Sequence, residues 1–225
     1  MESTLHRQLK FLYGGVAEDL EVQVDGYRID AVVRGRLFEI QQASLSALRD
    51  KVRQLLQRHR VVVVKPLISR KYLIRRDHPG GEIVSARYSP THETVLNLFK
   101  DLVHFVNVFP HPRLTLEVVL TEQEEHRITR ARCRRRGPDF RVEDRLLVEV
   151  VSTTKLKTAA DLRKLLPSTL PADFTTGDLA LHAKIPRWLA QKMAYCLRKT
   201  GAIEVVGKHG NAMRYGLPRK SKRAA

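Results

Sequence analysis

Residues 21–41 read EVQVDGYRIDAVVRGRLFEIQ, three short runs of alternating apolar and polar residues separated by Asp25-Gly26 and Arg34-Gly35. Asp-Gly favours the two-residue type I′ turn of a β-hairpin, and Arg-Gly also puts glycine where a turn needs a positive φ angle. The stretch therefore predicts a three-stranded antiparallel meander, with strands over residues 21–24, 27–33 and 36–41.

The two turns also predict the register of the meander, because a two-residue turn determines which residues face each other. Glu21 then lies opposite Asp30, and Asp30 lies opposite Glu39, all on one face of the sheet. Like charges in such a row repel, and a divalent cation would relieve the repulsion. Mg²⁺ or Mn²⁺ suits these oxygen ligands, with the carbonyl of Ile40 as a further one. The alternative is that the three carboxylates simply face water among arginines.

The segments around the meander alternate between helical and strand patterns. Leucines at helical spacing predict an amphipathic helix over residues 3–13, and a serine cap opens a second helix that ends near His59. Val61–Val64 is a continuous apolar run, typical of a strand buried on both faces. This order predicts an α/β (α+β) domain over residues 1–129, in which helices cover a mixed sheet. Its other expected elements are strands over 71–75, 83–87 and 114–120 and a helix over 94–106.

Two short segments, RID at 28–30 and EIQ at 39–41, are followed by a helix and an apolar strand. Together they resemble the core motif of the PD-(D/E)XK nucleases. The resemblance implies a restriction-endonuclease-like mixed sheet flanked by helices, in which Asp30 and Glu39 bind one or two Mg²⁺ ions. The lysine of the family motif is replaced by Gln41, as in a few restriction endonucleases, and its proline is absent.

This resemblance implies metal-assisted hydrolysis of a phosphodiester. The metal would polarise the scissile phosphate, lower the pKa of a bound water and stabilise the leaving oxygen. The amide oxygen of Gln41 accepts a hydrogen bond and so positions that water, although an amide is no base. Lys51 on the following helix is a candidate for the missing ammonium; the alternative is a solvated or phosphate-facing lysine. An acidic residue of the preceding helix often joins such sites, which makes Glu2 a further candidate.

Charge divides the chain unevenly. The 41 Lys and Arg and 24 Asp and Glu residues give a net charge of +17, and 11 basic residues against 1 acidic residue fall in residues 181–225. The arginine-rich run before Gly137-Pro138 predicts a basic linker over residues 130–140, with a phosphate-gripping loop as the alternative. We expect a second domain over residues 141–217, with a first strand over 146–151, and a basic disordered tail over 218–225.

Residues 158–217 carry the pattern of three helices followed by a β-hairpin. Thr158-Ala-Ala-Asp161 and Thr175-Thr-Gly-Asp178 are capping boxes that open two helices. Pro186 takes the first-turn position of a third helix, which Gly201 ends. This order resembles the winged helix-turn-helix.

In a winged helix, the outer face of the third helix enters the major groove of duplex DNA and the wing contacts the backbone or minor groove. Trp188 and Tyr195 are expected to pack against the domain, with base contact as the alternative. The resemblance assigns DNA binding to Arg187, Gln191, Lys192, Arg198 and Lys199 on the helix and to Lys208, His209 and Arg214 on the wing.

The composition indicates which partner and which cellular compartment to expect. A basic chain favours a polyanionic partner, here DNA, whose phosphates attract Lys and Arg. The longest strongly apolar run, residues 61–64, is too short to span a bilayer, and the N-terminus lacks the layout of a secretory signal, so we expect no membrane contact. Two cysteines cannot form a disulfide framework, which favours a reducing cytoplasm.

The functional prediction is a cytoplasmic, metal-dependent endonuclease directed to duplex DNA by its winged helix, with Mg²⁺ or Mn²⁺ as cofactor and a homodimer left open. The alternative is a catalytically inactive DNA-binding regulator or defence-system subunit that keeps the nuclease fold for interaction only. An RNA-processing role is least favoured, because a winged helix usually presents its helix to a duplex major groove. Approach of a lysine or another cation to the Asp30–Glu39 pair would favour the enzyme.

Overall fold

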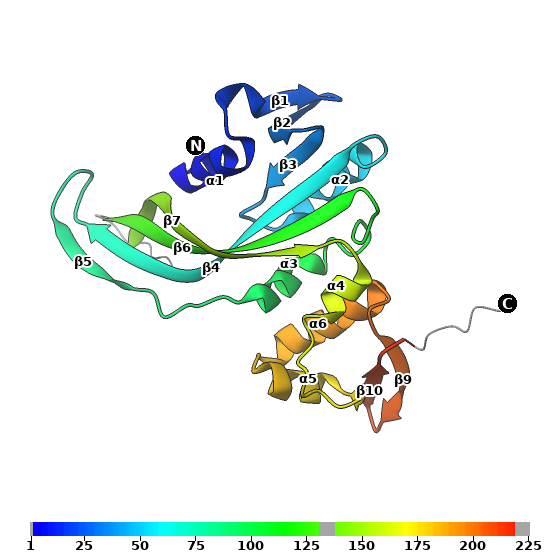
Figure 1. Ribbon diagram of the computed structural model, residues 1–225. Helices are drawn as coiled ribbons and strands as arrows, with labels where there is room; N and C mark the ends of the chain where they lie inside the picture. The colour runs from blue at the N-terminus through cyan, green and yellow to red at the C-terminus, as the bar shows by residue number, and fades with distance from the viewer. Residues whose placement is uncertain (1, 131–137, 219–225) are drawn as a thin grey trace.

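The computed structural model describes residues 2–130 and 138–218 (Figure 1). The chain begins with helix α1 (Thr4–Gly14) and then forms the expected meander of β1 (Leu20–Val24), β2 (Tyr27–Val33) and β3 (Arg36–Ile40). Both two-residue turns have positive φ at each position: 49° and 79° at Asp25-Gly26, and 50° and 70° at Arg34-Gly35. Positive φ at both positions defines the type I′ turn, so the turn chemistry of the sequence is confirmed.

A mixed sheet organises the N-terminal part of the chain. After the meander come a 3₁₀ turn (Leu45–Leu48), α2 (Arg49–Leu55) and β4 (Arg60–Arg76), and later β5 (Ile83–Tyr88), β6 (Leu114–Thr129) and β7 (Phe140–Leu156). A second 3₁₀ turn (Val95–Leu98) and α3 (Phe99–Leu102) connect β5 to β6. The strand order is β1-β2-β3-β4-β6-β7, and β5 pairs with β4. The β3–β4 and β4–β6 pairs are parallel, and all other pairs of this sheet are antiparallel.

Helices cover both faces of this sheet. On one face, Leu5 and Leu9 of α1 are buried against Ala31, Phe38 and Val62. On the other face, the buried side chains of α2 and α3 pack against alternate residues of the same strands, among them Leu37, Val61 and Val63. The central valines are therefore buried on both faces, as a continuous apolar strand predicts.

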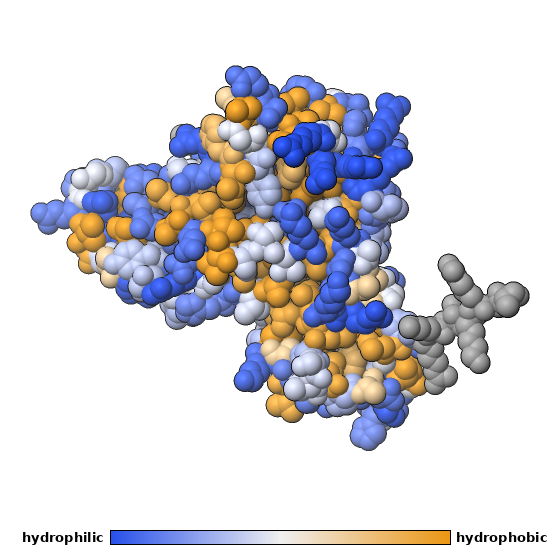
Figure 2. Space-filling view, viewed as in Figure 1, coloured by the Kyte–Doolittle hydropathy of each residue, from blue (hydrophilic) through white to orange (hydrophobic). Residues whose placement is uncertain are grey.

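The strands β4, β5, β6 and β7 form a curved arm beyond the helices (Figure 1). We expected Val61–Val64 and residues 71–75 as separate strands, but both belong to the single strand β4. Pro66 does not interrupt it, because β3 ends at the Ile40–Val64 pair and leaves that side of β4 open. The distal half of β4 pairs with β5 and β6, and β7 completes the arm. Figure 2 shows apolar surface on the arm interspersed with hydrophilic side chains.

The boundary between the two parts of the chain lies later than the sequence suggested. β7 pairs with β6 from Thr129–Phe140 to Leu116–Leu156, so residues 141–156 belong to the first sheet and not to the C-terminal domain. The predicted linker over 130–140 instead connects two neighbouring strands. Its arginines at 132–136 and the expected tail over 219–225 lie outside the described residues. We place the boundary near residue 157.

The C-terminal unit consists of three helices and a small sheet. Its helices are α4 (Ala159–Arg163), α5 (Thr176–Ala183) and α6 (Arg187–Lys199), and both predicted capping boxes are present. The sheet order is β8-β10-β9, with β8 (Asp173–Phe174), β9 (Glu204–His209) and β10 (Ala212–Gly216). α6 packs on α3, and Lys192 Nζ donates to the Lys100 carbonyl at 3.3 Å. Within the described ranges, no helix is long and apolar enough to span a bilayer.

Candidate active site

The strands β2 and β3 part at Asp30. Their ladder runs from Val33–Arg36 to Ala31–Phe38 and stops there, and the side chain of Asp30 takes over, with Oδ2 accepting the Ile40 N–H at 2.7 Å. Residues two apart in a strand normally share a face, yet Ile29 packs with α2 and Ala31 packs with α1. The strand therefore twists at Asp30 and turns this carboxylate into the opening between the two strands.

Two contacts hold Asp30 in its charged form. His6 Nε2 of α1 lies 3.2 Å from Oδ1, and the Ile40 N–H occupies Oδ2. Burial alone would raise the pKa of Asp30, but the hydrogen bonds from His6 and Ile40 outweigh burial, so that its pKa is lowered. Asp30 is thus a fixed anion at neutral pH.

Glu39 lies behind this opening, on the side of α2, so the prediction that it shares one face with Glu21 and Asp30 was wrong: those two acids contact α1, whereas Glu39 contacts Lys51 of α2. It is 3% exposed, and Lys51 Nζ lies 2.6 Å from its Oε1. The ion pair lacks hydrogen-bond geometry, so Oε1 makes no hydrogen bond among the described residues. Burial raises the pKa of Glu39, and Lys51 offsets only part of that effect. Lys51 also donates to the Arg28 carbonyl at 2.6 Å, which fixes its ammonium at the opening.

The predicted third acid, Glu21, has a different environment. The pairs on either side of it, Leu20–Ala31 and Val22–Ile29, have the predicted register. Glu21 itself has a φ of 57°, and its carboxylate binds Lys10 Nζ at 2.5 Å and also Arg28. The negative charge of Glu21 is therefore balanced by Lys10 and Arg28, whereas the sequence suggested that a divalent cation would balance it.

Helix α1 contributes cations and an acid that close one side of the site. Lys10, which is almost fully buried, lies 2.5 Å from Glu2 Oε1 as well as from Glu21. His6 lies 3.5 Å from the same oxygen of Glu2. We missed His6 and Lys10 in the sequence, although Glu2, His6 and Lys10 repeat every four residues and so share one face of a helix.

Glu2, His6, Lys10, Glu21 and Asp30 line an open cleft of about 660 Å³ between α1 and the sheet, whereas Glu39 and Lys51 lie outside its lining. Gln41 borders the cleft, and its Nε2 donates to the Ser44 carbonyl at 2.7 Å, which orients the amide. Ile40 contributes its N–H to Asp30, whereas we had assigned a role to its carbonyl. The cleft also contains Ser3, Gln42 and Ala43.

The site supplies only part of the donor set that a divalent metal needs. Among the residues that the structure describes, no three carboxylate, imidazole or thiol groups converge on one point. Asp30 borders the cleft, and the buried Glu39 carboxylate, paired with Lys51, lies close enough to Asp30 to interact with it electrostatically. Hard oxygen donors with remaining positions open to water suit Mg²⁺. The pair fits such an ion, with water or substrate completing the coordination.

The predicted DNA-binding residues form a separate group on the C-terminal unit. On α6, Arg187, Gln191, Arg198 and Lys199 are exposed, while Lys192 is partly buried against Lys100. The wing residues are exposed too, and Arg214 pairs with Asp173 at 2.8 Å. These residues lie across the sheet from α1, so the structure does not bring them to the cleft (Figure 1).

Two aromatic residues on α6 are more exposed than we expected. Trp188 is 47% exposed and Tyr195 is 40% exposed, so neither ring belongs to the buried face of the helix. They lie seven residues apart, two helical turns, in the middle of the exposed face. The buried face of α6 instead consists of Leu189, Ala190, Met193, Ala194, Cys196 and Leu197.

Comparison with known proteins agrees with the division of the chain near residue 157. The chain belongs to the family described as Domain of unknown function (DUF8091), whose model matches residues 3–157. It is also 31% identical over 180 residues to an uncharacterized protein of Treponema pallidum (strain Nichols), an alignment that covers 80% of this chain and 71% of the relative. That alignment is longer than the family match, so it includes part of the C-terminal unit. No solved structure matches the chain.

Proposed function

We propose that this protein is a metal-dependent nuclease that hydrolyses DNA phosphodiesters at the cleft between α1 and the β2–β3 opening. The proposal includes a restriction-endonuclease-like fold for residues 3–157 and a cytoplasmic setting. The observation that carries it is the ion pair between Lys51 Nζ and Glu39 Oε1, 2.6 Å apart, with Lys51 also bonded to the strand that holds Asp30. Gln41 replaces the lysine of the motif on β3, and Lys51 brings an ammonium to the same two strands from α2.

Each residue of the site has a role in this chemistry. Asp30 and Glu39 would hold the ion, and a bound Mg²⁺ supplies Lewis-acid polarisation of the phosphate and a more acidic water. His6 and the Ile40 N–H keep the Asp30 carboxylate charged and correctly oriented. Lys51 would stabilise negative charge that develops on the phosphate, as fixed cations do in a partly dry site.

The C-terminal unit would direct the nuclease to duplex DNA as a winged helix. Three helices followed by the β9–β10 hairpin support this assignment, and so does the exposed basic face of α6. Lysine and arginine side chains strengthen binding by releasing counterions from phosphates. On this proposal α6 enters the major groove, and Lys208, His209 and Arg214 contact the backbone or minor groove.

A second candidate is a non-enzymatic DNA-binding regulator that keeps the same fold. One observation favours it: Lys10 and Arg28 already neutralise Glu2 and Glu21, which reduces the need for a metal. An inactive site would keep these ion pairs for stability alone. The two candidates differ in whether Asp30 and Glu39 support turnover.

The test is nicking of supercoiled plasmid, and cleavage of branched and single-stranded DNA, with Mg²⁺ or Mn²⁺. Asp30→Asn, Glu39→Gln and Lys51→Met should each lower the rate by about 10²-fold or more. Lys155→Met is the matched control, because Lys155 of β7 pairs with Glu117 of β6 and does not line the cleft. Absence of cleavage on every substrate, or cleavage that survives Asp30→Asn and Glu39→Gln, would support the regulator instead.

A further inference from the structure

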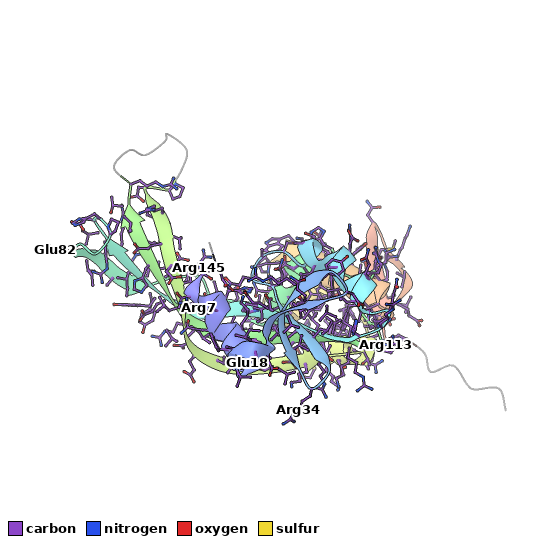
Figure 3. The ribbon with its side chains drawn as sticks, turned by 90° about the horizontal axis from the view of Figure 1, so that it is seen from above. Arg7, Glu18, Arg34, Glu82, Arg113 and Arg145 are labelled. Carbon is purple, nitrogen blue, oxygen red and sulfur yellow. The ribbon has the colours of Figure 1, made fainter. Side chains whose placement is uncertain are left out.

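A second cavity lies next to the cleft, where the arm leaves the body of the protein. It encloses about 380 Å³, within the range of about 300–1,000 Å³ for small-ligand pockets. Three segments line it: the loop after β3, the start of α3, and the inner face of the arm. Figure 3 shows the arm rising from the body, with Arg145 at its base close to α1.

The arm side of this cavity is positively charged. Lys71 Nζ and Arg145 Nε each lie 3.0 Å from Glu125 Oε2, and Arg127 binds the other oxygen of Glu125. Glu125 is 2% exposed, and its pKa falls to about 2, because burial, which would raise it, is outweighed by these cations. Three cations thus share one carboxylate, which leaves excess positive charge where Lys71 and Arg145 border the cavity.

The opposite wall adds a cation and an amide. Lys100 borders the cavity from α3, with its ammonium 2.9 Å from Glu93, and Asn97 lies one turn earlier. Gln123 on β6 is 3% exposed and donates to Thr121 Oγ1 at 2.8 Å, which orients its amide. The wall between these polar groups is apolar, formed by Pro66 and its neighbours. Amides, apolar surface and cations together suit a base, a sugar and a phosphate.

The cavity and the cleft share one wall. Gln42 and Ala43 line both spaces, and Lys65 holds this loop by donating to their carbonyls at 3.0 and 2.6 Å. Lys65 is buried and also pairs with Asp101 of α3 at 2.9 Å. On the proposed function, a strand with one phosphodiester at the cleft would place a neighbouring nucleotide at this shared wall.

We propose that this cavity binds one unpaired nucleotide of the DNA strand, with its phosphate on Lys100, Lys71 and Arg145 and its base against the apolar wall. The inference rests on the proposed nuclease function and names its substrate class as DNA with an unpaired nucleotide. The volume suits one nucleotide and not a base pair. The nucleotide has two sources, a strand end or a base extruded from a duplex.

The test measures binding of dTMP to the full chain by titration calorimetry in EDTA, so that no cleavage is required. Wild type and Asp30→Asn should bind dTMP alike, and Lys100→Gln should bind at least 10-fold more weakly. Asn97→Ala is a second variant, and Lys155→Gln is the matched control. Thermal melts establish that each variant is folded. Equal binding of thymidine and dTMP, no binding of dTMP, or unchanged binding in Lys100→Gln and Asn97→Ala would overturn the proposal.

Two further experiments distinguish the two sources of the nucleotide and test the two proposals separately. Competition by an oligonucleotide with free ends identifies a strand end, and competition by a closed dumbbell with one unpaired base identifies an extruded nucleotide; failure of both overturns the inference. Binding of dTMP without any nuclease activity would support the nucleotide site and overturn the nuclease function. Nuclease activity with no binding of dTMP would support the nuclease function and overturn the nucleotide site.

Discussion

Lys51 and Glu39 form an ion pair of 2.6 Å between α2 and β3, and Lys51 also donates to the Arg28 carbonyl on β2. One ammonium therefore joins the helix to both strands of the opening. The pairing places a lysine beside the acids even though the motif position on β3 is Gln41. Lys51 therefore stabilises the contact between the helix and the two strands, and on the proposed function it also takes part in the reaction.

Lys51→Met should destabilise the fold. The substitution leaves the nearly buried Glu39 carboxylate without its cation, and the expected loss is about 1–3 kcal/mol, below the ~3–5 kcal/mol of a fully buried pair, since Lys51 is partly exposed. Urea unfolding measures this difference. The double variant Lys51→Met/Glu39→Gln should recover part of the loss; equal losses in the single and double variants would contradict an ion pair as the cause.

Lys10→Met should strengthen the binding of Mn²⁺. Lys10 pairs with both Glu2 and Glu21, so its removal takes one positive charge from each acid at the cleft, while Arg28 stays on Glu21 and His6 stays beside Glu2. We expect a several-fold lower Kd for Mn²⁺ by calorimetry, together with a lower Tm. The Kd should rise again in Lys10→Met/Asp30→Asn. An unchanged Kd in Lys10→Met would show that Glu2 and Glu21 take no part in metal binding.

Glu125 should stabilise the protein at neutral pH and lose this effect in acid. Its pKa is about 2 in the folded protein, below the ordinary value of 4.5, so its contribution is present above about pH 4.5 and is lost as the pH falls toward 2. The difference in unfolding free energy between wild type and Glu125→Gln should reach at most about 3 kcal/mol near pH 6 and shrink steadily below pH 4. Glu149→Gln, at an exposed position on β7, is the control.

Two residues on α6 should affect DNA binding in different ways. Arg198→Ala should lower the slope of log K against log salt by about 1, because it removes one phosphate contact. Trp188→Ala should weaken binding at every salt concentration without changing the slope, because a ring contributes contact area and not charge. Filter binding at several salt concentrations separates these effects. Both side chains are exposed, so the Tm of each variant should stay within a few degrees of wild type.

The fragment 1–157 should fold, and the fragment 1–140 should not. The shorter fragment lacks β7, so the long strand β6 becomes an unpaired edge and α1 loses its contacts with Asp144 and Leu147. Circular dichroism melts would show a cooperative transition for 1–157 alone. A cooperative melt of 1–140 would return the boundary to the position that the charge pattern suggested.

The sequence was most informative where turns determine pairing. Asp25-Gly26 and Arg34-Gly35 were sufficient to predict the meander, its register and the position of Asp30 beside β3. Both signals are local, because a two-residue turn admits few geometries. The capping boxes at Thr158 and Thr175 were reliable for the same reason.

Features that depend on distant partners were missed. β7 looked like part of the C-terminal domain because its alternation is compatible with any sheet, and only pairing with β6 decides its place. Similarly, no local pattern joins Val61–Val64 to residues 71–75, which are continuous because β6 runs beside both. The role of Lys10 depended on the packing of α1 against β1, a contact between separate elements.

The buried Lys65 ammonium helps to hold the cleft at a constant distance from helix α6. It ties the Gln42–Ala43 loop to Asp101, and the adjacent residue Lys100 accepts the hydrogen bond from Lys192 of α6. The loop beside the cleft and helix α6 are thus joined by a short chain of hydrogen bonds and one turn of α3. On the proposed function, this rigid connection means that a duplex bound to α6 is cut at a constant distance from the bound sequence.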